Sequence, residues 1–115
     1  MMSRDLLEKI LKSEFDLNLN ELIDFLLLFK KNDYIYPSTI KNKFNFNNKK
    51  IYILFTILEA EKIVKMYYEI YCYTCNKPIK IYEKFGQIDN SIICNYCENN
   101  ILNENSIKVV YKVVK

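Results

Sequence analysis

The hydrophobic positions in the N-terminal half of the chain follow helical spacing. After Ser3, which can cap a helix, the large aliphatic residues fall at i, i+1, i+4 and i+5 and form one stripe: Leu6, Leu7, Ile10 and Leu11. We expect this helix to run to about Glu14. A second helix, capped by Asn18 or Asn20 and running through Lys30, is apolar on nearly every face, so it is predicted to be the buried centre of this half.

Two further helices are predicted on either side of Asn45. Ser38 can cap the first of them, with Ile40 and Phe44 facing inward. Asn45 lies where a tight turn needs a left-handed residue, and Asn47 can cap the next helix. In that helix, apolar residues recur at i, i+3, i+4 and i+7: Ile51, Leu54, Phe55 and Leu58. This spacing predicts one buried helix face.

The pattern changes after Val64 to runs rich in β-branched and aromatic residues, which are typical of strands. The runs are Met66–Tyr71, Lys80–Tyr82, Ile92–Ile93 and Ile107–Val114. The expected fold class is therefore α+β, with a helical domain at residues 1–66 and a β domain at residues 67–115.

Four cysteines occur in the strand-rich half with the spacing C-x2-C-x18-C-x2-C: Cys72, Cys75, Cys94 and Cys97. This spacing is typical of a structural zinc site, because two tight turns can aim four sulfurs at one tetrahedral Zn²⁺. The chain has no histidine, and a four-thiolate shell leaves no position for water or substrate. We therefore predict one structural Zn²⁺. The segment from about Tyr67 to Lys115 resembles a zinc ribbon, with Asn76 in place of the glycine that usually follows a cysteine pair.

Other uses of the cysteines fit less well. Disulfides need an oxidising compartment, and the first residues carry charges among their apolar positions, unlike a signal peptide. A redox dithiol needs only one C-x-x-C pair. Iron binding remains an alternative. No apolar run approaches the length of a membrane span, so a cytoplasmic protein without membrane contact is expected.

The net charge of the chain says little about its function, whereas the distribution of charge along the sequence is informative. The formal net charge is +3, and four thiolates with one Zn²⁺ would bring it to about +1. Between residues 37 and 58, however, there are four lysines and no acidic residue before the end of the helix. No phosphate-binding loop, histidine or paired carboxylate arrangement occurs, so we expect no enzymatic activity.

One stretch resembles the winged-helix family of DNA-binding repressors, over about Asn20 to Tyr71. Phe44-Asn-Phe-Asn47 matches the family's turn, and Leu58-Glu59 with Ile63-Val64 match its exit toward the wing. The resemblance implies a transcriptional regulator that binds duplex DNA with the helix Asn48 to Leu58 in the major groove. The residues then expected to contact DNA are Lys41, Lys43, Asn48, Lys49, Lys50, Tyr52 and Thr56.

The chain departs from that family in ways that support an alternative. Tyr52, Ile53 and Ile57 are poor readers of bases, and Lys62 replaces the glycine that commonly starts the wing. An apolar helix face suits a protein interface, so the alternative is an adaptor in a multi-subunit assembly. The stripe of the first helix is expected to cover the second, which leaves at most a weak homodimer through faces around Tyr52, Ile53 and Ile57.

Overall fold

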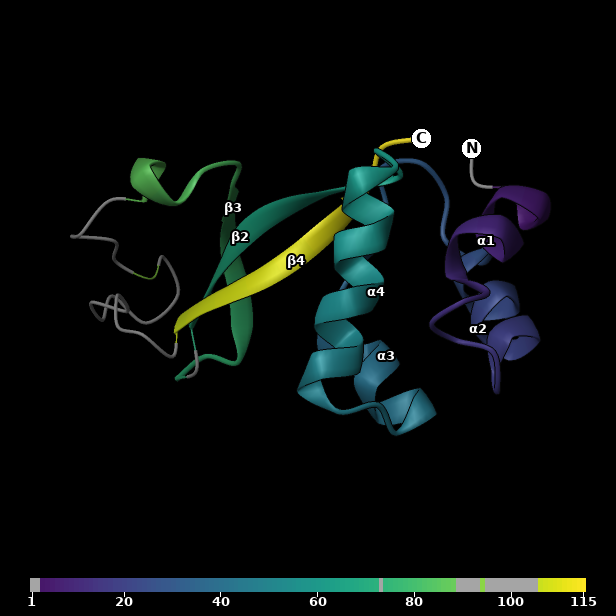
Figure 1. Ribbon diagram of the computed structural model, residues 1–115. Helices are drawn as coiled ribbons and strands as arrows, with labels where there is room; N and C mark the ends of the chain where they lie inside the picture. The colour runs from purple at the N-terminus through teal and green to yellow at the C-terminus, as the bar shows by residue number, and fades with distance from the viewer. Residues whose placement is uncertain (1–2, 73, 89–93, 95–105) are drawn as a thin grey trace. The chain divides into compact units, whose positions relative to one another are not determined.

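The computed structural model describes residues 3–72, 74–88, 94 and 106–115, and its fold is α+β, as predicted. The α-helices in this part of the chain are α1 (Arg4–Leu11), α2 (Leu19–Leu26), α3 (Pro37–Phe44) and α4 (Asn48–Ala60) (Figure 1). The strands are β1 (Tyr34–Ile35), β2 (Val64–Cys72), β3 (Lys77–Tyr82) and β4 (Ile107–Val113), with a 3-10 turn at Phe85–Gln87. No helix in the described ranges is long and apolar enough to cross a membrane.

The strands form one sheet in the order β1-β4-β2-β3. β1 runs antiparallel to β4, with Tyr34 opposite Lys112, and β2 runs antiparallel to β3. The chain divides into two compact units: a helical unit, Met1–Lys65 with Tyr111–Lys115, and a ribbon unit, Met66–Val110. The last five residues thus belong with the helices, whereas the sequence analysis placed every residue after position 66 in the ribbon.

In the helical unit, α1 begins as expected and ends early. Ser3 Oγ accepts a hydrogen bond from the Leu6 N–H at 3.2 Å, which confirms the predicted cap. Leu7 and Leu11 are wholly buried. The helix ends at Leu11 rather than near Glu14, where the main chain turns and carries Phe15 into the core.

α2 supplies the middle of the helical core. Leu22, Ile23 and Leu26 are wholly buried. The helix ends at Leu26 rather than Lys30, because the N–H groups of Leu28 and Phe29 bond to carbonyls three positions back and tighten the last turn. Leu28 follows that turn and is left 72% exposed.

The pair α3–α4 contains the predicted left-handed turn. Asn45 has φ 55° and ψ 39°, and its N–H bonds to the Lys41 carbonyl. Asn47 Oδ1 accepts from the Lys50 N–H at 2.8 Å, so both expectations for the turn are confirmed. The prediction that Ser38 caps α3 is wrong: Tyr36 is the N-cap residue and Pro37 occupies the first turn, where its fixed φ favours helix entry.

We expect Asn45→Ala to lower the free energy of unfolding by about 1 kcal/mol, because a Cβ without a local polar partner is disfavoured at φ 55°. Asn45→Gly should match or exceed the wild type, since glycine accepts this conformation. Urea unfolding of the two variants measures the difference. An alanine variant as stable as the glycine variant would contradict a left-handed Asn45.

The ribbon unit is built on the β2–β3 hairpin. Tyr68 pairs with Tyr82 and Cys72 with Lys77, and the register shifts between Ile70 and Tyr71. β3 starts earlier than predicted and includes Pro78. Among the described strands β3 pairs on one side only, and an edge strand is where a sheet accepts a proline.

Candidate metal centre and nucleic-acid face

The first cysteine pair lies at the tip of the β2–β3 hairpin. Cys72 is the last residue of β2, and Cys75 stands two positions before β3. Asn76, between Cys75 and β3, has φ 56°, as expected for the residue that follows a zinc-binding pair. Its Oδ1 accepts a hydrogen bond from Tyr71 Oη at 2.5 Å. The left-handed turn folds the chain back at once, so both sulfurs stay at the same end of the hairpin.

Three cysteine sulfurs converge. The Sγ atoms of Cys72, Cys75 and Cys94 all lie within 4.8 Å of one another, and Cys75 Sγ is 3.7 Å from Cys94 Sγ. Two sulfurs bound to one tetrahedral metal at about 2.3 Å are separated by about 3.8 Å. A disulfide would require about 2.05 Å, so the Cys75–Cys94 distance fits a shared metal rather than a bond. The three cysteines could hold a metal ion.

The cysteines also form the core of the ribbon unit. Cys72 and Cys94 are wholly buried beside Ile70, and half-buried residues pack around them: Cys75, Ile79, Tyr82, Ile88 and Ile107. Such an apolar shell limits the access of water to metal-bound thiolates. The fourth predicted ligand, Cys97, and the predicted strand Ile92–Ile93 lie outside the described residues.

The helical unit presents the second candidate site on α4. Asn48, Tyr52 and Thr56 follow one another at i+4 spacing and therefore share a helix face, and all three are exposed together with Lys49. Lys41 Nζ donates to Asn48 Oδ1 at 2.6 Å, which links the last turn of α3 to the first turn of α4. This set combines amide, hydroxyl and ammonium groups, which are the groups that contact phosphates and base edges.

The predicted lysine patch divides in the structure. Lys50 is half-buried: its ammonium donates to the Glu14 carbonyl and lies 4.8 Å from the centre of the Phe15 ring. Lys43 lies 5.2 Å from the Phe25 ring and 5.9 Å from the Phe44 ring. Lys50 is therefore engaged within the chain, while Lys49 stays at the surface of the same helix turn.

The apolar face proposed for protein contacts is narrower than the sequence suggests. Ile53 and Ile57 are half-buried and pack against the helical core. Tyr52 alone of the three is largely exposed, at 72%. The outer face of α4 is thus mixed rather than apolar, with one aromatic ring among polar side chains.

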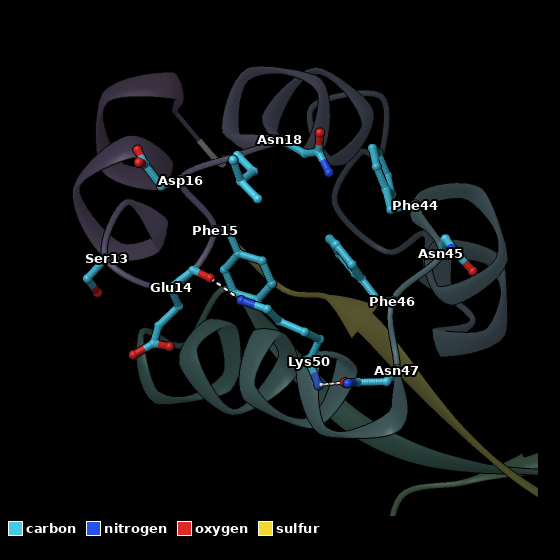
Figure 2. Close-up of a pocket in the computed structure, with 11 residues that line it drawn as sticks. Ser13, Glu14, Phe15, Asp16, Asn18, Phe44, Asn45, Phe46, Asn47 and Lys50 are labelled. Atoms are coloured by element: carbon cyan, nitrogen blue, oxygen red, sulfur yellow. Dashed lines mark hydrogen bonds between the residues drawn. The ribbon is translucent and has the colours of Figure 1, made fainter.

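The helical unit contains a cavity of about 450 Å³ that the sequence did not predict. Its lining combines the turn after α1 with the turn between α3 and α4: Ser13, Glu14, Phe15, Asp16, Leu17, Asn18, Phe44, Asn45, Phe46, Asn47 and Lys50 (Figure 2). The only sequence signal was the helix break after Glu14, which says nothing of what lies opposite it.

Comparisons with models of protein families, with curated proteins and with solved structures find no match to this chain. The function must therefore be argued from the two candidate sites themselves.

Proposed function

We propose that the chain is a zinc-containing DNA-binding protein of winged-helix type that acts as a transcriptional regulator. The observation that carries the proposal is the α3–α4 pair, in which a left-handed Asn45 and a capping Asn47 precede a helix with an exposed polar face. A left-handed turn followed by a helix with exposed polar residues is what a helix-turn-helix needs, and this supports the proposal.

The backbone conformation between α4 and β2 supports the same proposal. Lys62 has φ 58°, the conformation that glycine commonly supplies where a wing begins. β2 then starts at Val64, directly after the apolar pair at which the resemblance places the wing. The departure noted in the sequence is therefore one of residue type and not of backbone conformation.

In the proposed complex, α4 enters the major groove by its first turns. Lys49 contacts phosphate, while Asn48, Tyr52 and Thr56 face base edges. Lys41 assists by holding Asn48 and adding positive charge beside it. Lys43 and Lys50 contribute less, because aromatic rings and the Glu14 carbonyl hold their ammonium groups.

Lys49→Glu is expected to weaken binding to mixed-sequence duplex DNA by about tenfold or more at low salt, because one phosphate contact becomes a repulsion. Fluorescence anisotropy against salt concentration should also show a slope smaller by about 1. Lys9→Glu on α1 makes the same charge change at another exposed lysine and serves as the control.

Lys50→Glu should reduce DNA affinity less than Lys49→Glu, since the Lys50 ammonium is already bound within the chain. If Lys9→Glu and Lys49→Glu lowered DNA affinity equally, the loss would reflect the change in net charge and not a binding site on α4. Wild-type protein that binds no duplex at low salt would end the proposal.

The alternative is a non-enzymatic adaptor that binds a protein in a larger assembly. The observation in its favour is Tyr52, an aromatic ring 72% exposed in the middle of α4, since tyrosine is enriched at protein interfaces. Purification from the native host decides between the two. The adaptor is favoured if a protein co-purifies in stoichiometric amount with the wild type and with Lys49→Glu, but not with Tyr52→Glu.

We propose Zn²⁺ as the metal, one per chain, with Cys97 completing the shell begun by Cys72, Cys75 and Cys94. The support is the sulfur spacing and burial already described. A four-thiolate Zn²⁺ supplies structural cross-linking and no catalysis. Elemental analysis of freshly purified protein gives the metal and its stoichiometry, and replacement by Co²⁺ should give the visible absorption of a tetrahedral thiolate site.

A further inference from the structure

The cavity in the helical unit has aromatic walls, and we call it the phenylalanine pocket after Phe15, Phe44 and Phe46. The ring centres of Phe15 and Phe46 are 5.6 Å apart, as are those of Phe44 and Phe46. All three rings stand around the cavity, and the Lys50 side chain runs past Phe15 toward the main chain of Glu14 (Figure 2). The pocket thus combines aromatic rings with the Lys50 ammonium, which reaches the Glu14 carbonyl, and the acidic residues Glu14 and Asp16 line it as well.

Leu17, at the edge of this pocket, is unusually exposed for a hydrophobic residue. Its side chain is 97% exposed, the largest value among the described large hydrophobic residues. A leucine in this position contributes nothing to the chain's own core, although an apolar cavity adjoins it. Its neighbour Asp16 is exposed as well and has no ion-pair partner among the described residues.

We propose that the phenylalanine pocket binds Leu17 of a second copy of this chain, in a symmetric dimer. Leu17 of each copy enters the other's pocket and lies against the phenylalanine rings. Each Asp16 carboxylate then meets the other copy's Lys50 ammonium, which donates one hydrogen bond to its own Glu14 carbonyl and keeps further N–H groups for a carboxylate. One surface carries both the protruding leucine and the pocket that accepts it, which is the condition for a two-fold interface.

Charge selects a second copy as the occupant. An entering segment needs one aliphatic side chain for the rings and one carboxylate for the lysine, and Asp16-Leu17 carries these adjacent to each other. The proposed contacts are one leucine and one ion pair from each copy, so the dimer is weak and forms only at high protein concentration. The surface differs from the Tyr52 face that the sequence suggested for self-association.

Sedimentation equilibrium of the zinc-loaded full chain, from micromolar to millimolar concentration and without DNA, tests the interface. We expect a reversible monomer–dimer equilibrium whose dissociation constant rises about tenfold or more for Leu17→Ser. This variant keeps its fold, because the side chain it removes is exposed. Leu28→Ser, which shortens another exposed leucine, should leave the equilibrium unchanged.

A charge exchange gives a second and independent readout. Asp16→Lys should weaken the dimer, and adding Lys50→Glu to it should restore the association, because the pair is rebuilt with reversed charges. A chain that stays monomeric at millimolar concentration overturns the proposal. So does a dimer that Leu17→Ser leaves intact. Since no measurement involves DNA, these outcomes are separate from any failure of the proposed DNA binding.

Discussion

Removal of the metal is expected to unfold the ribbon unit while most of the helical unit stays folded. Four hydrophobic residues are wholly buried in the described part of the ribbon unit, Ile70, Cys72, Cys94 and Val110, and two of them are cysteines, so little apolar burial remains once the thiolates lose their common ligand. Structural Zn²⁺ supplies about 10–16 kcal/mol of apparent binding free energy in small domains. Hydrogen exchange with a strong chelator present should show protection lost in β3 and retained in α2 and α4.

Cys94→Ser should reproduce the effect without a chelator, since it removes a wholly buried ligand. Thr74→Ala changes an exposed residue between Cys72 and Cys75, and this variant should bind metal as the wild type does. A Cys94→Ser protein that is free of metal and still protected in β3 would contradict a structural metal centre.

Leu7→Glu is expected to unfold the helical unit, with a loss of more than about 4 kcal/mol in the free energy of unfolding. The substitution places a carboxylate at a wholly buried position in the core formed by α1, α2 and α4, where neither water nor a cation is available to it. Leu28→Glu makes the same change at a residue 72% exposed and should cost less than about 0.5 kcal/mol. Far-ultraviolet circular dichroism during urea unfolding measures both.

The same variant tests where α1 directs its apolar stripe. If Leu7→Glu yielded a folded monomer from a tight wild-type dimer, the stripe would serve a second copy rather than α2. Burial of Leu7 and Leu11 within one chain leaves no room for that arrangement, which agrees with the expectation from the sequence.

The features that the sequence predicted correctly depend on interactions between residues that are close together in the sequence. Asn45 and Asn76 take left-handed conformations because asparagine is the best non-glycine residue there, and Ser3 and Asn47 cap helices through their own neighbours. Helical spacing likewise identified the buried face of α4. Each of these choices needs no knowledge of the rest of the fold.

The features that were missed depend on distant partners. Helical spacing places Lys50 one turn before buried Leu54, but it does not show that Lys50 meets a carbonyl and a ring that come from the turn after α1. The exposure of Leu17 and the cavity beside it follow from the same turn lying against the α3–α4 turn. Likewise, Pro78 is acceptable in β3 only because this strand lies at the sheet's edge, which the residues near it do not reveal.

Because the last residues of the chain pack in the helical unit, the parts of the fold are completed in a fixed order during synthesis. Tyr111 stacks on Phe55 with ring centres 4.1 Å apart, and Val113 exchanges main-chain hydrogen bonds with Asn32 and Asp33. These contacts form only after the ribbon segment has left the ribosome. All four cysteines therefore emerge while the helical unit still lacks its last residues, so a nascent chain can bind the proposed metal before the packing of the helical unit is complete.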